Sequence, residues 1–310
     1  MVGKTPLIII TGPTCSGKTS LAMHLRKDYP IEVLSADSMQ VYRYLDIGTA
    51  KPSPDERAYL KHYLIDMVNP DQEFNAGMFT HAATKALIDI KSTSHIPLVV
   101  GGTGLYIRAL VYGLSDAPAA SSSIRTAINK VARRKGRQHL YKMLKRLDPE
   151  YASKITFNDI SKIMRALEII FLTGRRPSDI HSDHAISRPV LPALVACINP
   201  DKETLYSNIN KRVISMIDRG LVQETERLLD MGYSPELPSL KNFTYRHVIS
   251  YLSSEIYLDR MIQLIQRDTR RFAKRQLTWF RANKPECVFL DLKDATSTVN
   301  QWLKEYWHRV

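Results

Sequence analysis

Short apolar runs alternate with amphipathic segments over the first hundred residues of the chain. Continuous apolar runs at 5–11, 31–36 and 96–100 predict strands, because a strand that is covered on both faces is apolar throughout. Helical patterns at 20–27 and 79–90 lie between them. This alternation predicts an α/β fold, a parallel sheet with helices on both faces.

The pattern changes after about residue 114. The chain then has helical character to about residue 184, and the apolar run at 193–198 predicts a return to the sheet. The part from Asp201 onward is mainly helical in pattern. We therefore expect a catalytic core made of residues 1–114 and 190–310, interrupted by a mainly helical insertion at 115–189.

A phosphate-binding loop lies between the first predicted strand and the first predicted helix. It matches the pattern G-x-x-x-x-G-K-[ST], in which backbone N–H groups surround a polyphosphate. Lys18 adds a positive charge, and the Thr19 hydroxyl can bind a Mg²⁺ ion that bridges phosphate oxygens. The motif predicts a sheet of the P-loop NTPase-like kind. Its expected diphosphate-binding residues are Gly12, Pro13, Thr14, Cys15, Ser16, Gly17, Lys18 and Thr19.

Polar residues follow the other predicted strands. Asp37 comes after the second strand, and Thr103 lies in the Gly-Gly-Thr-Gly turn after the strand at 96–100. Ligands of such sheets bind beyond the carboxyl ends of the strands, so both side chains should meet the phosphate loop. Asp37 is a candidate general base, or alternatively a helix N-cap or a Mg²⁺ contact. Thr103 is a phosphate donor or a simple turn residue.

Two further observations concern phosphate chemistry. The strand at 96–100 ends in glycines, where a P-loop ATPase usually carries Asp or Glu, so a motor or helicase is not expected. Arg212, on a predicted helix, is a candidate for neutralising phosphate charge, although a lone arginine is more often a surface residue.

The charge distribution indicates a polyanionic partner. The chain has 44 Lys and Arg against 31 Asp and Glu, a net charge of +13. Residues 117–147 contain no acidic residue and nine Lys and Arg. A predicted helix between 261 and 281 carries a basic stripe opposite an apolar face, which favours a polyanion-facing surface over plain solvation.

The remaining composition points to an intracellular protein. The three cysteines have no C-x-x-C spacing, so neither a disulfide framework nor a zinc site is expected. The N-terminus has no signal-peptide pattern, and no apolar run approaches the ~18 residues of a membrane span. We expect a cytoplasmic location and no membrane partner.

Several segments together resemble the tRNA dimethylallyltransferase family. They occur in the family's order: GPTCSGKT at 12–19, SADSMQVYR at 35–43, DIGTAKP at 46–52, HYLID at 62–66, GGTGLY at 101–106, RALE at 165–168 with TG at 173–174, and AKRQLTWFR at 273–281. The combination is far more specific than the phosphate loop alone. The zinc-finger extension of eukaryotic relatives is not found in the sequence, which indicates the bacterial type.

The resemblance implies a reaction and its residues. The family transfers a dimethylallyl group from its diphosphate to N6 of the adenosine on the 3′ side of the tRNA anticodon. The implied base is Asp37, with Thr103 and Arg212 stabilising the diphosphate beside Mg²⁺. The implied partners are dimethylallyl diphosphate and the tRNA anticodon stem-loop, bound by a monomer. The implied tRNA contacts are Asp37, Ser38, Met39, Gln40, Thr103, Arg125, Ser161, Lys162, Ile163, Met164 and Arg165.

The chain departs from the family pattern at three places. Ser161-Lys162 replaces the usual Gln-Arg, Asn208 stands where arginine is common, and Thr244-Tyr245-Arg246-His247 replaces Gly-Tyr-Lys-Glu. These changes leave the diphosphate site intact and bear on the affinity for tRNA or the choice of tRNA. The alternatives are an adenylate isopentenyltransferase, a P-loop kinase of a small substrate, and a nucleotide-gated RNA-binding protein without turnover.

Overall fold

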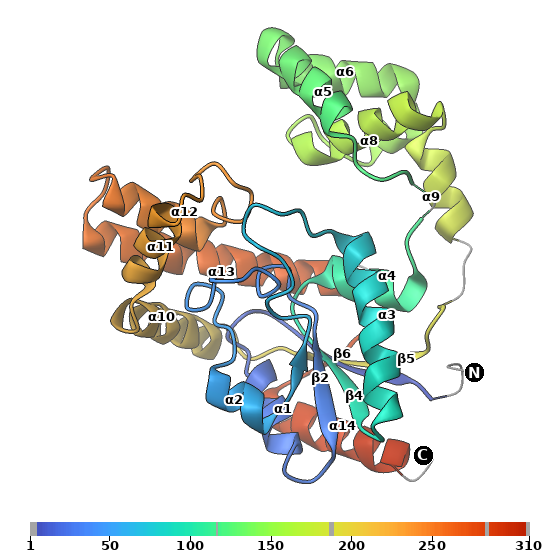
Figure 1. Ribbon diagram of the computed structural model, residues 1–310. Helices are drawn as coiled ribbons and strands as arrows, with labels where there is room; N and C mark the ends of the chain where they lie inside the picture. The colour runs from blue at the N-terminus through green and yellow to red at the C-terminus, as the bar shows by residue number, and fades with distance from the viewer. Residues whose placement is uncertain (1–4, 116, 186–188, 283–284, 308–310) are drawn as a thin grey trace. The chain divides into compact units, whose positions relative to one another are not determined.

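The computed structural model describes residues 5–115, 117–185, 189–282 and 285–307 (Figure 1). The chain divides into two compact units. The larger unit contains Met1–Tyr112 and Val190–Val310, and the smaller contains Gly113–Pro189.

The larger unit is built on a parallel sheet. In the described residues its strands are β1 (Leu7–Thr11), β2 (Ile31–Ser35), β3 (His62–Tyr63), β4 (Ile96–Val100), β5 (Ala193–Ile198) and β6 (Val288–Leu290). Their order is β3-β2-β4-β1-β5-β6, and every pairing is parallel. The predicted strands are confirmed. The edge strands β3 and β6 were not predicted, because two or three residues are too few for a periodic pattern.

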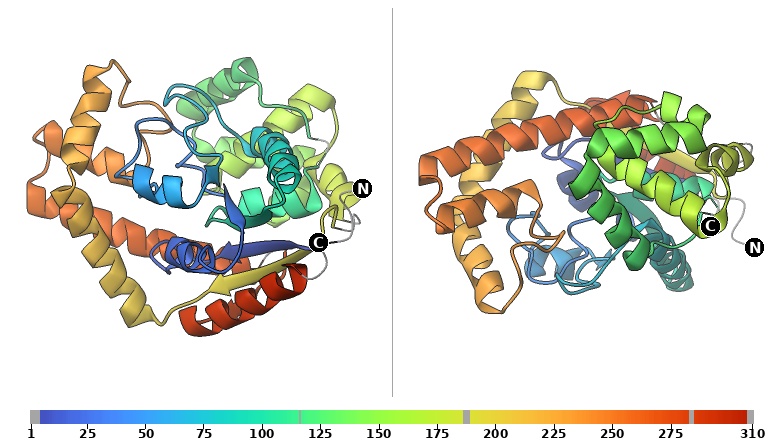
Figure 2. Two further views of the ribbon diagram at one scale, coloured as in Figure 1. Left: turned by 60° about the horizontal axis from the view of Figure 1, so that its bottom comes forward. Right: turned by 90° about the horizontal axis from the view of Figure 1, so that it is seen from above.

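Helices cover both faces of the sheet. Ile9 of β1 faces a core with Phe79 of α3 (Ala76–Ser92) and Tyr106 of α4 (Gly104–Tyr112). Its neighbours Ile8 and Ile10 face the opposite core, formed with α1 (Lys18–Leu25) and α14 (Leu292–Trp307). Figure 2 (left) shows α14 in red and α3 in teal on opposite sides of the sheet. The predicted α/β class, with a P-loop NTPase-like sheet, is confirmed.

A third core lies beside the carboxyl ends of the strands. It is formed by α10 (Lys202–Asp218), α11 (Leu221–Asp230), α12 (Phe243–Leu252) and α13 (Leu258–Ala282), and by apolar residues of the loop at 39–50. The short α2 (Pro54–Tyr59) follows that loop, with Ser53 as its N-cap in a capping box with Glu56. The third core therefore fixes the long loop that follows β2.

The smaller unit is helical. Its elements are α5 (Ser122–Lys135), α6 (Arg137–Leu147), α7 (Pro149–Ser153), α8 (Ile160–Thr173) and α9 (Pro177–Ala185). They enclose a separate apolar core that includes Leu140, Leu144 and Leu167. Asp148 caps α7, and its second oxygen accepts from the Ser178 N–H at 2.8 Å, which ties α7 to α9.

In the part of the chain that the structure describes, no helix is long and apolar enough to cross a membrane. The three cysteines are unpaired thiols, and burial raises the pKa of Cys197 to about 12 and that of Cys287 to about 11.

Candidate active site

A cavity of about 690 Å³ opens in the larger unit at the carboxyl ends of β1, β2 and β4. The loops that follow these three strands line it, together with α10 and α13. The sheet therefore brings together groups far apart in sequence. The lining includes, among the expected residues, Thr14, Cys15, Ser16, Gly17, Lys18, Thr19, Asp37, Ser38, Met39, Gln40, Thr103 and Arg212.

The phosphate loop has the geometry of an anion site. Gly12 and Gly17 have φ of 136° and 96°, and Cys15 also lies in the left-handed region at 64°. Glycine is required at position 12, because a Cβ there would lie 2.4 Å from the Ile198 carbonyl oxygen. Helix α1 begins without a side-chain cap, and the buried Ser16 hydroxyl has no hydrogen-bond partner among the described residues. These donors fit phosphate oxygens.

Lys18 is a partly buried cation in this loop. Its Nζ donates to the carbonyl oxygens of Gly12 at 3.1 Å and Pro13 at 2.6 Å. Within the described ranges no carboxylate forms an ion pair with it. Burial lowers the pKa of Lys18 to about 8, with the Asp37 charge raising it and the Arg212 charge lowering it further.

The lowered pKa of Lys18 predicts a pH dependence. Lys18 is charged below about pH 8 and loses its proton above it. We expect the affinity for pyrophosphate to fall up to tenfold per pH unit above that pKa. Calorimetric titration between pH 7 and 9 measures this. In Lys18→Met the remaining dependence of the affinity on pH reflects the protonation of pyrophosphate alone. Equal pH dependences in the wild type and in Lys18→Met would rule out a contribution from Lys18.

Asp37 and Thr103 line the same cavity because β2 and β4 are paired, with Ser35 opposite Val100. Asp37 Oδ1 accepts from the N–H groups of Met39 at 2.8 Å and Gln40 at 3.3 Å. Asp37 is therefore a turn cap through one oxygen. Its Oδ2 has no hydrogen bond with the part of the protein described here, which leaves an acceptor for a substrate proton.

Thr103 also has a local role. Its Oγ1 accepts from the Ser38 N–H at 3.0 Å and lies 3.3 Å from the Ser38 hydroxyl. This bond joins the loops after β2 and β4. Thr103 is thus a turn residue by its contacts and also lines the cavity, and its role as a phosphate donor stays a prediction.

Arg212 of α10 reaches the phosphate loop. Its Nη1 donates to Thr14 Oγ1 at 3.0 Å, and its Nη2 lies 3.4 Å from the Thr49 carbonyl oxygen. The guanidinium group thus faces the same cavity as Lys18. It is not a plain surface arginine.

Gln276 of α13 is a contact that sequence reasoning did not assign. Its Oε1 accepts from the Thr14 N–H at 2.9 Å, and its Nε2 donates to the Gly102 carbonyl oxygen at 2.9 Å. A Cβ at Gly102 would lie 2.3 Å from that Nε2. Gln276 lies within the AKRQLTWFR run, and that run was the available signal.

The expected tRNA contacts of the smaller unit have mixed environments. Ile163 is fully buried, so its side chain is not available to tRNA, and this expectation is corrected. Ser161 and Lys162 are exposed and Met164 is partly buried. Arg125 and Arg165 both pair with Glu168, whose side chain is completely buried. The N–H of Ser121 donates to the same carboxylate at 2.7 Å.

The Glu168 carboxylate predicts a large stability effect. Burial raises its pKa, but hydrogen bonds from Arg165, Ser121 and Arg125 outweigh burial and lower it. Glu168→Gln leaves the two guanidinium groups without their counter-charge, so we expect a loss of about 3 kcal/mol in the free energy of unfolding. Urea denaturation measures it.

The matched control for that variant is Glu150→Gln, which removes an exposed ion pair with Lys154. We expect it to change the free energy of unfolding by less than about 0.5 kcal/mol. Equal effects of the two variants would contradict the role of Glu168.

The departures from the family pattern also have partners. The Asn208 amide lies 3.5 Å from the Cys15 carbonyl oxygen, and Tyr245, which the family pattern shares, donates to Glu224 at 2.8 Å. His247 Nε2 lies 2.9 Å from Asp268 Oδ2. Hydrogen bonds from Arg267 and then His247 lower the pKa of Asp268 to about 2, although burial opposes them.

The basic stripe of α13 is therefore partly neutralised. Asp268 lies within it and pairs with Arg267 at 2.9 Å and Arg271 at 3.4 Å. Lys274, Arg275 and Arg281 stay exposed. On the opposite face Met261, Ile265 and Phe280 are buried, as predicted.

The comparisons with known proteins agree on one family. The sequence profile described as "IPP transferase" matches residues 40–283. A relative from Geotalea uraniireducens (strain Rf4), tRNA dimethylallyltransferase 2, is 46% identical over 305 residues, with 98% of each chain covered. Another from Syntrophotalea carbinolica, tRNA dimethylallyltransferase 1, is 44% identical over 277 residues, covering 89% of this chain and 88% of its own.

Solved structures give the same result. A full-length tRNA isopentenylpyrophosphate transferase from Bacillus halodurans is 33% identical, with a TM-score of 0.70 over 99% of this chain and 98% of that chain. A eukaryotic dimethylallyltransferase described as acting on tRNA is 26% identical, with a TM-score of 0.78 over 96% of this chain and 76% of its own.

Proposed function

Since the chain belongs to the IPP transferase family, we propose that it transfers a dimethylallyl group from dimethylallyl diphosphate to N6 of an adenosine in tRNA, the one on the 3′ side of the anticodon. Diphosphate is released. One observation carries the proposal: the phosphate loop, Asp37, Thr103 and Arg212 line a single cavity.

The residues of the cavity suit this chemistry. The adenine N6 attacks the first carbon of the allyl group as the carbon–oxygen bond to the diphosphate breaks. The electron pair of that bond leaves with the diphosphate, where Lys18 and Arg212 offset the added charge. Asp37 Oδ2 accepts the N6 proton as the new bond forms. This base matters because the N6 lone pair is delocalised into the ring.

The residues present fit a Mg²⁺ ion bound through the diphosphate. No cluster of three or more acidic, His or Cys side chains is found in the described ranges, so an all-protein metal cage is not indicated. Mg²⁺ usually binds by one or two protein oxygens with substrate phosphates. The exposed Thr19 hydroxyl at the cavity provides such a ligand. When bound, the ion would offset phosphate charge.

The smaller unit provides a surface for tRNA. Its α5 and α6 carry nine exposed cations, and only Arg125 has an ion-pair partner within the described residues: Arg125, Lys130, Arg133, Arg134, Lys135, Arg137, Lys142, Lys145 and Arg146. Unpaired cations of this kind bind a phosphate backbone by releasing its counterions. We infer that the helical insertion at 115–189 binds the tRNA. We also propose that the chain acts as a monomer.

The surface predicts a salt dependence. We expect the logarithm of the tRNA association constant to fall linearly with the logarithm of the salt concentration. Lys142→Gln with Lys145→Gln should reduce the slope by roughly 1.5, because each lost phosphate contact removes about 0.7 to 0.9. Filter binding measures this. An unchanged slope would place the tRNA elsewhere.

Prenyl transfer from labelled dimethylallyl diphosphate to unmodified tRNA tests the proposal directly, with free AMP in a parallel reaction. Label in tRNA alone supports it. Label in AMP alone favours the adenylate isopentenyltransferase. Label in neither substrate, with the protein folded and tRNA bound, overturns prenyl transfer. The remaining alternatives are then the P-loop kinase and the RNA-binding protein that has no turnover.

A further inference from the structure

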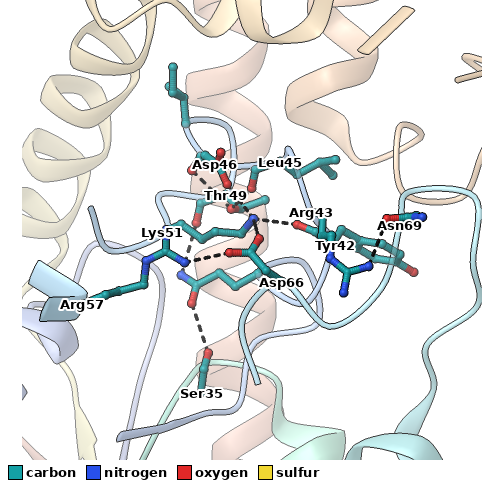
Figure 3. A network of polar contacts seen from close by, with 12 residues as sticks. Ser35, Tyr42, Arg43, Leu45, Asp46, Thr49, Lys51, Arg57, Asp66 and Asn69 are labelled. Atoms are coloured by element: carbon teal, nitrogen blue, oxygen red, sulfur yellow. Dashed lines mark hydrogen bonds and ion pairs between the residues drawn. The ribbon is translucent and has the colours of Figure 1, made fainter. Parts of the chain in front are cut away.

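A buried lysine, Lys51, lies in one wall of the cavity. The side chain of Lys51 is 1% exposed, and its ammonium group has three acceptors (Figure 3). These are the Tyr42 carbonyl oxygen, Asp46 Oδ1 and Asp66 Oδ1, each at 2.6 Å. An ammonium group has three donors, so all are used. Burying such a charge is unfavourable unless it is fully paired, and these three acceptors supply the pairing for Lys51.

The backbone around Lys51 is strained. Ala50, the preceding residue, has φ of 48°, and Asp66 has φ of 56°. Residues with a Cβ rarely adopt this conformation, and it persists only where the surroundings fix it. Asp66 is fixed twice, because its Oδ2 also accepts from Arg57 at 2.7 Å. The ion pairs of Lys51 therefore hold a shape that the backbone does not favour.

Glu224, on α11, binds the backbone of the loop that leads to Lys51. Its carboxylate accepts from the N–H groups of Asp46 at 3.0 Å, Ile47 at 2.7 Å and Gly48 at 3.0 Å. The loop Asp46–Lys51 is thus held at its start by a carboxylate and at its end by an ammonium group. Two such anchors leave little freedom to the residues between them.

The residues between the anchors contact two residues that line the cavity, Arg212 and Gln40. The Thr49 carbonyl oxygen accepts from Arg212 at 3.4 Å. The Gln40 amide nitrogen lies 3.5 Å from the same Thr49 oxygen and 3.3 Å from the Ala50 carbonyl oxygen. Gln40 is also fixed from the sheet, because Ser35 donates to its Oε1 at 3.1 Å. The Asp46–Lys51 loop therefore sets where Arg212 and Gln40 lie relative to the phosphate loop.

We propose that Lys51 is a positioning residue for the transfer reaction. It touches neither phosphate nor base in this role. It fixes the Asp46–Lys51 loop so that the Thr49 carbonyl holds the Arg212 guanidinium against the phosphate loop. The inference rests on the proposed function for its meaning in catalysis, but the arrangement of the diphosphate site can be tested without turnover.

A double-mutant cycle on pyrophosphate affinity tests this role. Lys51→Met should weaken pyrophosphate binding about tenfold, and Arg212→Ala by at least as much. In the double variant Lys51→Met should add less than about twofold, because it acts through Arg212. Independent, multiplicative losses would overturn the inference, as would an unchanged affinity in Lys51→Met. Thermal melting of each variant separates these effects from loss of fold.

Three further measurements complete the test. Lys61→Met, at an exposed lysine beside Tyr63, should leave pyrophosphate affinity unchanged. Should Lys51→Met not fold, Asp46→Asn replaces it, since Asp46 is 56% exposed and supplies one of the two charges. In the transfer assay Lys51→Met should lower kcat/KM for dimethylallyl diphosphate, as expected of a residue that acts on the diphosphate site through Arg212. If the wild type shows no transfer but the pyrophosphate affinities are coupled, the proposed function is refuted, while the placement of Arg212 by Lys51 in the anion site still holds.

Discussion

Asp37→Asn is expected to reduce prenyl transfer about a thousandfold, because a general base contributes roughly 10²–10⁴ to such a rate. The amide keeps an oxygen that can accept from the Met39 and Gln40 N–H groups, so the turn should be preserved. The amide cannot take the N6 proton. A single-turnover rate with labelled dimethylallyl diphosphate and saturating tRNA measures the loss.

The binding of tRNA should be nearly unaffected by Asp37→Asn. We expect the tRNA affinity to stay within about twofold, because contacts to many phosphates carry it and the Asp37 carboxylate is not one of those contacts. Asp55→Asn, at an exposed position in the first turn of α2, is the control and should transfer normally. A fall of less than tenfold in Asp37→Asn would mean that Asp37 only caps the turn and that the proton leaves by another route.

The fold was largely predictable because its signals are local. The strands β1, β4 and β5 are continuous apolar runs, and the phosphate loop is a contiguous motif between a strand and a helix. Asp37 and Thr103 could be placed at one edge of the sheet from the rule that parallel strands end on the same side. The structure puts both in the predicted cavity.

The features that the sequence did not predict depend on contacts between residues far apart in the chain. Gln276 bonds Thr14 across 262 positions, and Glu224 bonds Gly48 across 176. No periodicity links such pairs, so one sequence gives no signal for them. Arg165 shows the converse problem. Its charge suits tRNA, but its guanidinium group donates to the buried Glu168 and to the Pro118 carbonyl oxygen.

Lys18→Met is expected to weaken pyrophosphate binding about ten- to a hundredfold. A charge-assisted hydrogen bond to phosphate contributes about 1.5–3 kcal/mol, and Lys18 has one N–H donor beyond the two that bond the Gly12 and Pro13 carbonyl oxygens. Transfer should fall by about a thousandfold, since charge on the diphosphate grows as its bond to carbon breaks. Calorimetric titration with pyrophosphate and the single-turnover assay measure the two effects.

The control is Lys27→Met, at an exposed lysine just after α1, which should bind pyrophosphate normally. Retained affinity in Lys18→Met would place the anion outside the phosphate loop. Asp37 supplies an independent check, because its charge raises the pKa of Lys18. Asp37→Asn should therefore move the pH midpoint of pyrophosphate binding downward. A base and a phosphate-binding cation that lie in one cavity must be coupled in this way, whereas groups in separate sites would titrate independently.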